Sequence, residues 1–254
     1  MMVALVTGAA GGIGAAIVRV LAEDGIPVAA LDRDAEALRT VVDKQTADGL
    51  LVTAFPADVG SSAEIESTVD GVERRLGPID RLVNAAGVLR LGRAVTLSDD
   101  DWVTTFAVNV TGVFYVSRAV VRRMVPRRAG SVVTIASNAA HTARMDMSAY
   151  AASKAAVTMF TKSLGLEVAA YGIRCNVVAP GSTETPMLSS LWGADDGPRS
   201  SIEGNLDSYR TGIPLRKIAK PSDIADAVAF LLSEKAGHIT LQHLTVDGGA
   251  TLGA

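Results

Sequence analysis

The chain has 254 residues, which suits one large α/β domain, and 48% of them are hydrophobic, enough to bury a sizeable core. A net charge of -3 with 20% charged residues gives no indication of a nucleic-acid partner or of a basic membrane anchor. Cys175 is the only cysteine, so the sequence excludes an intrachain disulfide and a cysteine-based zinc site.

The N-terminus lacks the basic region and the cleavage site of a signal peptide. No apolar run approaches the roughly 20 residues of a membrane span. We therefore expect a cytoplasmic protein in a reducing compartment, with no contact to a membrane.

Seven short apolar runs are typical of buried strands. They are residues 2–7, 27–31, 50–55, 79–84, 131–136, 173–179 and 240–246. Helical patterns alternate with these runs. Ser61 and Ser98 each stand three residues before an acidic residue, the spacing of a capping box, and the helix after Ser98 is expected to continue to about Val125. Pro221 and Ser222 open the last helix.

The seven runs are apolar throughout, whereas a half-exposed strand would alternate apolar and polar residues. This favours an α/β fold in which a doubly wound, seven-stranded parallel sheet carries helices on both faces. No linker or repeat divides the chain, so residues 1–254 are expected to form a single domain. In such sheets ligands bind beyond the carboxyl ends of the strands, where small and polar residues follow the first six runs.

A glycine-rich turn, residues 8–14, follows the first run directly. Its glycines allow a tight turn and let the backbone approach a pyrophosphate, which would then meet the N-terminus of a helix. Many strand-to-helix turns also use glycine for steric reasons alone. The position after the first strand favours the dinucleotide interpretation.

Asp32 ends the second run, about 20 residues further on, where a dinucleotide site has an acidic residue. A carboxylate there accepts hydrogen bonds from a ribose diol and repels a 2′-phosphate. Asp32 could instead cap the next helix, and Arg33 could accommodate the phosphate. Because the glycine turn contains no basic residue, we favour NAD over NADP.

Tyr150 and Lys154 are four residues apart in a helical pattern, so they lie on one helix face. An adjacent ammonium favours the phenolate and lowers the pKa of a phenol from its usual value near ~10. A tyrosine with a lowered pKa can take the proton of an alcohol while hydride leaves the same carbon. The same spacing also occurs in surface pairs and packed helix faces, so the hypothesis requires a hydride acceptor nearby.

Several motifs, taken in order, resemble those of the short-chain dehydrogenase/reductase family. They are Thr7-Gly8-x-x-x-Gly12-Ile13-Gly14, Asn84-Ala85-Ala86-Gly87, Asn109, Ser137, Tyr150, Lys154 and Pro180-Gly181. They cover nearly the whole chain. The resemblance implies a single-domain Rossmann fold, a nicotinamide cofactor and a homotetramer.

The resemblance also implies a role for each matched residue. Tyr150 is the expected base, Lys154 would bind the nicotinamide ribose and lower the tyrosine pKa, and Ser137 would hold the substrate oxygen. Asn109 would anchor a water in the proton relay, although a lone buried asparagine is more often structural. The residues expected to contact the cofactor are Gly8, Gly12, Ile13, Gly14, Asp32, Arg33, Asp58, Val59, Asn84, Ala85, Gly87, Lys154, Pro180, Gly181 and Thr183.

Within the family, segments such as NAAGVLRLG and SNAAHTARMDMSAYAASKAA are similar to those of the 2,3-dihydro-2,3-dihydroxybenzoate dehydrogenases of catechol siderophore biosynthesis. This similarity implies that NAD oxidises a carboxylated cyclohexadiene diol, an aromatic-precursor acid, to the catechol 2,3-dihydroxybenzoate. It also implies that residues 182–212, here called the lid, cover the substrate.

A substrate with a carboxylate predicts a cation near its site. Arg90 and Arg144 are the candidates, although both could equally be exposed surface residues. Met187 and Trp192 would contact the substrate from the lid. His141 could shuttle a proton, but a structural histidine is favoured, and no cluster has the pattern of a metal site.

Other functions remain open. The substrate could be another ring carbinol, a dihydro-hydroxyanthranilate or a 3-oxoacyl compound. From a different class, the chain could be a non-catalytic NAD-binding regulator, but such proteins usually lack the tyrosine or the lysine, and both are present here.

Overall fold

The computed structural model describes residues 2–190 and 197–253. Seven parallel strands form one sheet in the order β3-β2-β1-β4-β5-β6-β7, which confirms the predicted doubly wound architecture. The strands are β1 (Val3–Thr7), β2 (Val28–Asp32), β3 (Val52–Pro56), β4 (Ile79–Asn84), β5 (Gly130–Ile135), β6 (Ile173–Pro180) and β7 (His243–Val246).

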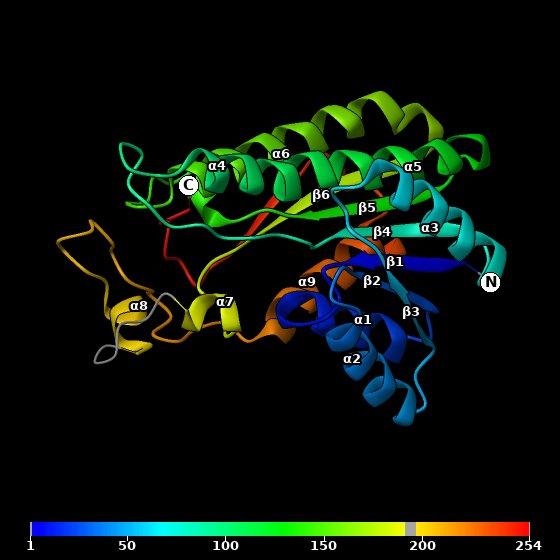
Figure 1. The fold of residues 1–254 in the computed structure, drawn as a ribbon, viewed down its shortest axis with the longest axis horizontal. Helices are drawn as coiled ribbons and strands as arrows, with labels where there is room; N and C mark the ends of the chain where they lie inside the picture. The colour runs from blue at the N-terminus through cyan, green and yellow to red at the C-terminus, as the bar shows by residue number, and fades with distance from the viewer. Residues whose placement is uncertain (1, 191–196, 254) are drawn as a thin grey trace.

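Helices cover both faces of the sheet, as Figure 1 shows. One face carries α1 (Gly12–Glu23), α2 (Ala35–Ala47) and α9 (Pro221–Leu232). The other carries α3 (Ser62–Arg75), α4 (Asp99–Phe106), α5 (Val113–Arg127) and α6 (Ser148–Val168). Short helical segments complete the chain: η1 (Ala107–Gly112), η2 (Asn138–Ala140), η3 (Ala169–Tyr171), α7 (Pro186–Ser189), α8 (Arg199–Glu203) and η4 (Glu234–Ala236).

The side chains of β1 explain why the strands are apolar throughout. Ala4 and Val6 point into the core beneath α1 and α9, while Val3 and Leu5 point into the core beneath α3 and α5. All four are fully buried. Since successive strand residues face opposite sides, a sheet covered on both faces needs apolar residues at every position.

The helix expected after Ser98 is present, and the Ser98 hydroxyl accepts the backbone N–H of Asp101 at 3.1 Å. Its middle turn, η1, is a π-helical insertion that the sequence did not predict. The continuous helix, Asp99–Arg127, is long and apolar enough to cross a membrane by length and composition, contrary to our expectation. Val116, Val120 and Met124 are nevertheless buried in the core, and a core helix passes the same test.

The last strand is shorter than predicted. Leu241 has a positive φ of 63°, which interrupts extended backbone, so β7 begins only at His243.

From β1 the chain adds β2 and β3 toward one edge of the sheet, and from β4 it adds β5, β6 and β7 toward the other edge. The strand order therefore switches between β1 and β4, which are neighbours at the centre of the sheet. In open α/β sheets a ligand crevice lies at this switch point, beyond the carboxyl ends of the strands. The lid helices α7 and α8 lie at that end, at the left of Figure 1.

Candidate active site

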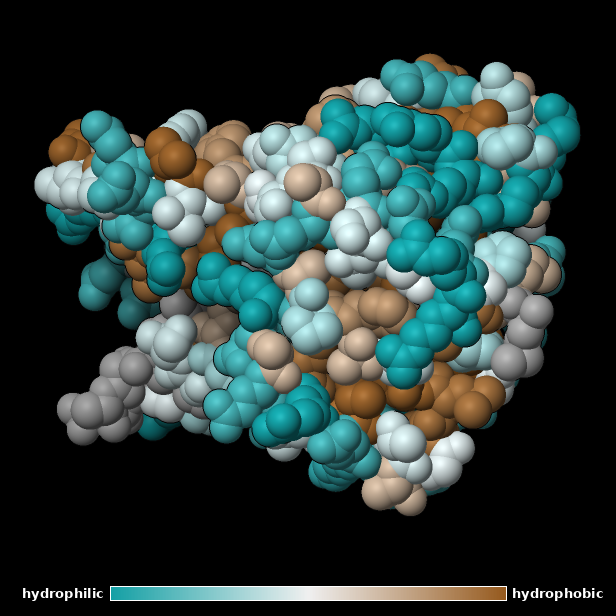
Figure 2. Space-filling model, turned by 45° about the vertical axis from the view of Figure 1, so that its right-hand side comes forward, coloured by the Kyte–Doolittle hydropathy of each residue, from teal (hydrophilic) through white to brown (hydrophobic). Residues whose placement is uncertain are grey.

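A cavity of about 780 Å³ lies at the carboxyl ends of the strands. The surface is visibly hollowed on the left side of Figure 2, between two projecting parts of the molecule. The walls of the cavity come from the segments that follow β1, β2, β3, β4, β5 and β6, together with the lid. The sites predicted separately from sequence therefore converge on one space.

The glycine turn forms one end of the cavity and has no room for side chains at two positions. A Cβ on Gly8, where φ is +69°, would lie 2.7 Å from the backbone nitrogen of Ala86. A Cβ on Gly14 would lie 2.0 Å from the carbonyl oxygen of Gly8. Helix α1 starts at this turn with no side-chain cap and no acidic residue in its first turn. Its exposed N–H groups suit a pyrophosphate.

Thr7 links the glycine turn to the loop after β4. Its hydroxyl oxygen accepts the backbone N–H groups of Ala85 and Ala86, each at 3.1 Å. Ala85, Ala86 and Gly87 line the cavity. Asn84 does not: its amide is 1% exposed and donates to Ser117 at 3.0 Å inside the core.

Asp32 contributes both carboxylate oxygens to this end. One accepts the N–H of Ala10 in the glycine turn at 3.1 Å, and the other accepts the N–H of Asp34 at 3.1 Å. The cap of α2 is Asp34, whose side chain accepts the N–H of Ala37, so the capping alternative for Asp32 is wrong. Arg33 also lines the cavity and is exposed.

Asp58 and Val59, which are expected to contact the cofactor, line the same end of the cavity. The backbone N–H of Asp58 donates to Glu64 at 3.0 Å, which fixes the loop between β3 and α3. Pro180, Gly181 and Thr183 line the opposite wall, where the Thr183 hydroxyl donates to the Gly181 carbonyl oxygen at 3.2 Å.

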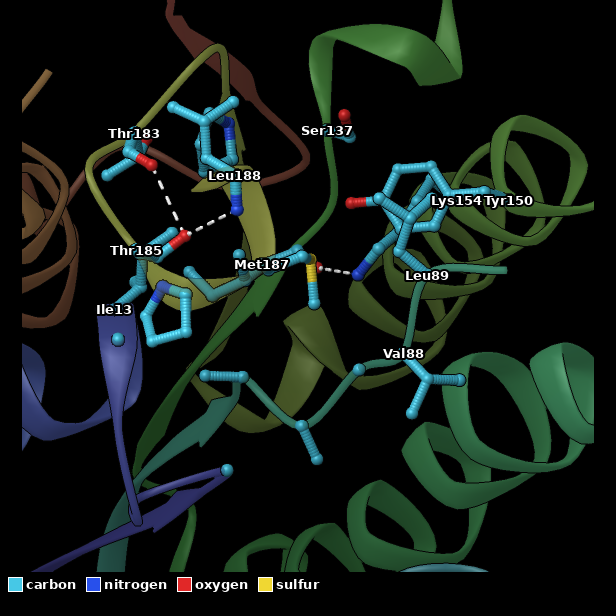
Figure 3. A pocket seen from close by; sticks show the side chains of 18 of the residues that line it. Ile13, Val88, Leu89, Ser137, Tyr150, Lys154, Thr183, Thr185, Met187 and Leu188 are labelled. Atoms are coloured by element: carbon cyan, nitrogen blue, oxygen red, sulfur yellow. Dashed lines mark hydrogen bonds between the residues drawn. The ribbon is translucent and has the colours of Figure 1, made fainter. Parts of the chain in front are cut away.

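Tyr150 and Lys154 lie on one face of α6 and both face the cavity, as Figure 3 shows. Lys154 is 5% exposed, and its ammonium donates to the carbonyl oxygen of Ile135 at 2.8 Å. The same nitrogen lies 5.7 Å from the centroid of the Tyr150 ring. The Tyr150 oxygen and the Ser137 hydroxyl both project into the cavity (Figure 3).

Burial dominates the acidities of this pair. It raises the pKa of Tyr150 above the usual value of a phenol, while the nearby Ser137 hydroxyl acts in the opposite direction. Burial also lowers the pKa of Lys154 to about 8. The structure therefore does not reproduce the expected lowering of the tyrosine pKa by Lys154, because the ammonium faces the ring and a backbone carbonyl while burial disfavours the phenolate.

Ser137 lies just after β5, at the start of η2, and is 8% exposed. Its hydroxyl oxygen accepts the N–H of Ala139 at 3.1 Å and thereby starts η2. The same residue also borders the cavity, so its role as the cap of η2 is compatible with the expected catalytic role.

Asn109 lies in the π-helical turn and is fully buried. Its amide accepts the N–H of Val88 at 2.8 Å and donates to the Val88 carbonyl at 2.9 Å and to Ser153 at 3.0 Å. These bonds join the loop after β4 to α6. A Cβ on Gly87 would lie 3.4 Å from both the Asn109 oxygen and the Lys154 nitrogen. The π turn, a feature often found at functional sites, directs this amide inward.

Only some of the residues expected to contact the substrate lie at the cavity. Arg144 and Met187 line the cavity. Arg90 does not, and it lies 3.5 Å from Asp101 as a half-exposed ion pair. His141 stands outside the cavity wall, with its Nε2 3.0 Å from the Nε2 of His243. Trp192 lies outside the described residues.

Thr185 and Arg210 are among the cavity residues that the sequence analysis did not single out. Thr185 caps α7 through the N–H of Leu188, and its methyl group would lie 3.3 Å from a Cβ on Gly12; the Thr185-Pro186 pair is a helix-start signal that could have identified it. Arg210 belongs to the polar part of the lid, where no periodic pattern marks it. Within residues 2–190 and 197–253, no group of three His, Cys, Asp or Glu side chains could hold a metal ion.

Comparisons with known proteins agree with this geometry. The short chain dehydrogenase family model matches residues 2–196. The chain is 57% identical over 251 residues to the 2,3-dihydro-2,3-dihydroxybenzoate dehydrogenase of Bacillus subtilis strain 168, with 99% of this chain and 96% of that protein covered. It is 43% identical over 249 residues to the Escherichia coli K12 enzyme of the same name, with 98% and 96% covered. A solved variant of the actinorhodin polyketide ketoreductase with NADPH has a TM-score of 0.91 and 37% identity, with 98% of this chain and 97% of that chain covered.

Proposed function

Because this chain belongs to the short-chain dehydrogenase/reductase family, we propose that it oxidises 2,3-dihydro-2,3-dihydroxybenzoate to 2,3-dihydroxybenzoate with NAD. The enzyme is an oxidoreductase that acts on a CH–OH group and uses a nicotinamide cofactor. The observation that carries the proposal is the placement of Tyr150, Ser137 and Lys154 at one wall of the cavity whose far end is the glycine turn.

Tyr150 acts as the base in this proposal. The phenol, once ionised, takes the proton of the substrate hydroxyl, while the hydroxyl of Ser137 holds the substrate oxygen. A nicotinamide held by the glycine turn and Lys154 would supply the acceptor for the hydride on the same carbon, so that a C–H and an O–H bond break as a C=O bond forms. The ketone then tautomerises to the catechol, and the gain in aromaticity makes the oxidation effectively one-way.

Lys154 and Asn109 support this step. The Ile135 carbonyl holds the ammonium of Lys154 over the tyrosine ring, where it would bind a nicotinamide ribose. Asn109 holds the loop after β4 at Val88 and contacts Ser153 on α6. Its anchoring of a water in a proton relay is part of the proposal, and its amide bonds give it a positioning role as well.

NAD is proposed over NADP on the strength of Asp32. Its carboxylate borders the cavity beside the glycine turn and is held there by Ala10 and Asp34. A fixed negative charge at this point accepts the ribose hydroxyls and repels a 2′-phosphate. Arg33 stands next to it as the one feature that favours the phosphate, and it is exposed.

The substrate assignment follows from the similarity to two enzymes of that name and from Arg144 at the cavity wall. Met187 contributes an apolar surface on the lid side, and Trp192 is proposed to do the same. Arg90 is the weaker candidate for the carboxylate, because its guanidinium is engaged by Asp101 outside the cavity.

A homotetramer in the cytoplasm completes the proposal. Phe114 on α5 and Met159 and Leu166 on α6 are 39%, 63% and 72% exposed. Apolar side chains gathered on two packed helices are typical of a surface that another subunit covers. Light scattering coupled to size-exclusion chromatography measures the assembly directly.

Product analysis tests the function. The purified enzyme is incubated with NAD and synthetic 2,3-dihydro-2,3-dihydroxybenzoate, and the products are separated. We expect equal amounts of 2,3-dihydroxybenzoate and reduced nicotinamide. If the cyclic diol is left unchanged while a dihydro-hydroxyanthranilate or a 3-oxoacyl substrate is turned over, the substrate assignment is wrong. If no alcohol is oxidised although NAD binds, the non-catalytic alternative holds.

A further inference from the structure

Two arginines from separate segments line the same end of the cavity. Arg144 comes from the loop between η2 and α6, six residues before Tyr150. Arg210 comes from the lid, where it pairs with Asn205 through backbone hydrogen bonds after α8. Both side chains are partly buried. Two separate segments therefore each contribute a guanidinium group to the wall of this cavity.

Neither guanidinium has a carboxylate partner in the part of the chain that the structure describes. Arg144 makes no hydrogen bond or ion pair there, and Arg210 makes one side-chain bond, a long one of 3.5 Å to the hydroxyl of Ser182. By contrast, the partly buried guanidinium of Arg123 lies 3.3 Å from the carboxylate of Glu66. A guanidinium has five N–H donors, so most of those on this pair remain free for a ligand.

The carboxylate whose charge acts on Arg144 already has hydrogen-bond partners of its own. Asp247 accepts hydrogen bonds from Asn138 at 3.2 Å, from Thr251 at 2.7 Å and from the N–H of Gly249 at 2.9 Å. It lies beyond ion-pair distance of the guanidinium, although its charge still raises the Arg144 pKa slightly against the larger lowering caused by burial. An external anion could therefore bind Arg144 without displacing a protein partner.

The two positive charges act on each other. Burial lowers the pKa of Arg210, and the charge of Arg144 lowers it further. An anion between them would remove this repulsion and replace the water lost by both groups.

Carboxylates are distributed unevenly along the cavity. Asp32, Asp34 and Asp58 line the end formed by the segments after β2 and β3, together with the exposed Arg33. At the other end, the cavity-lining carboxylate is Asp146, which lies 3.8 Å from Arg93. The two partly buried arginines therefore lie at the end with the catalytic tyrosine, where few carboxylates compete for them.

We propose that Arg144 and Arg210 together bind the carboxylate of the substrate, one from the catalytic loop and one from the lid. This inference rests on the proposed function and adds Arg210 as a specificity-determining residue. The ligand class is a ring that carries both a carboxylate and the carbinol to be oxidised. A guanidinium on each side of the carboxylate would orient the ring so that its hydroxyl meets Ser137 and Tyr150.

The test compares two probes that differ only in the carboxylate. The affinities of 2,3-dihydroxybenzoate and of catechol for the enzyme with reduced NAD are measured by calorimetry for the wild type, Arg144→Gln, Arg210→Gln and the double variant. Arg216→Gln is the matched control, because Arg216 is an exposed lid-proximal arginine outside the cavity.

We expect each single variant to weaken the binding of the acid by about tenfold or more and to change catechol binding by less than about twofold. The fold loss of affinity for the acid in the double variant should be smaller than the product of the two single losses, because both groups bind one carboxylate. The control should behave as the wild type.

Equal losses for acid and catechol in Arg210→Gln would overturn the inference, since they would indicate a structural role in the lid. Unchanged acid binding would overturn it as well. Turnover separates this result from the proposed function. If the wild type oxidises the cyclic diol acid and both single variants bind the acid as tightly as the wild type, the proposed function stands and the role of the two arginines is wrong. A wild type that does not oxidise the acid loses the function, and the two binding affinities still decide the role of the arginines.

Discussion

The ammonium nitrogen of Lys154 lies over the ring of Tyr150, 5.7 Å from its centroid, and is bonded to the Ile135 carbonyl at 2.8 Å. The two residues are thus fixed as a pair by the sheet beneath them, since Ile135 is the last residue of β5. The phenol oxygen remains free to face the cavity and Ser137 (Figure 3). The phenol oxygen, which transfers the proton, is therefore separate from the Lys154 ammonium, which faces the ring.

The first prediction concerns the proton acceptor. Tyr150→Phe should lower turnover by at least about a hundredfold, because it removes the hydroxyl that exchanges a proton with the substrate. NAD binding, followed by titration, should persist, because the glycine turn and Asp32 are untouched. Tyr171→Phe, at the far end of α6 in η3, is the control. Near-normal turnover of the Tyr150 variant would remove this residue from the mechanism.

The second prediction concerns the cost of burying Lys154. Burial lowers its pKa from 10.5 to about 8, a difference equivalent to about 3 kcal/mol. Because the folded-state pKa lies below the unfolded one, the unfolded chain binds more protons between these two pH values. The loss of folding stability caused by burying the ammonium is therefore complete below about pH 8 and disappears above about pH 10.5. Lys154→Met should therefore unfold at a higher temperature than the wild type at neutral pH, while its turnover is lost.

The gap between the two melting temperatures should narrow as the pH rises toward the unfolded-state value. Lys217→Met, at an exposed position, should show no such change. A Lys154→Met protein that is less stable than the wild type at neutral pH would show that the hydrogen bond to Ile135 outweighs the cost of burial.

The sequence predicted the sheet and most of the cavity wall for a physical reason. Strand positions such as Val3 to Val6 must be apolar when both faces are covered, and glycines such as Gly8 and Gly14 are required where backbones approach each other. These constraints are local, so a pattern in the chain reveals them. The same holds for the Ser98 cap.

Features that depend on the tertiary environment were missed. The pKa of Tyr150 depends on burial, which the four-residue spacing does not contain. The sequence predicts Arg90 and Arg144 equally well as partners of the substrate carboxylate. In the structure Arg90 pairs with Asp101 on the surface, whereas Arg144 lines the cavity. Arg210 reaches the site through the path of the lid, which no periodic pattern describes.

The third prediction separates the two cofactors. Asp32→Asn removes the charge and keeps the shape, so it should weaken NAD binding by about tenfold and weaken NADP binding less or improve it. Asp34→Asn is the matched control, because asparagine also caps a helix and Asp34 caps α2. Titrations with both cofactors measure the ratio of affinities. An equal loss for NAD and NADP would mean that Asp32 serves only to hold Ala10.

The fourth prediction concerns acid stability. Burial, with repulsion from His141 and Lys162, lowers the pKa of His243 to about 4. The unfolded chain therefore takes up this proton first, and the folded state loses stability as the pH falls from about 6.5 toward about 4. His243→Gln should flatten this part of the curve in thermal melts, whereas His238→Gln, at an exposed site, should not. An unchanged slope in His243→Gln would assign the acid sensitivity to other groups.

The fifth prediction tests the glycine turn with two alanine substitutions three residues apart. An added Cβ would lie 2.0 Å from the Gly8 carbonyl oxygen at Gly14, but would meet nothing within 4 Å at Gly11. Gly14→Ala must therefore push α1 away from the turn, and we expect a lower melting temperature and weaker cofactor binding. Gly11→Ala should melt like the wild type, because its φ of -179° is extended backbone that any residue adopts. Since both changes add the same methyl group to the same turn, equal melting temperatures would show that the close approach of Gly14 to Gly8 does not constrain the fold.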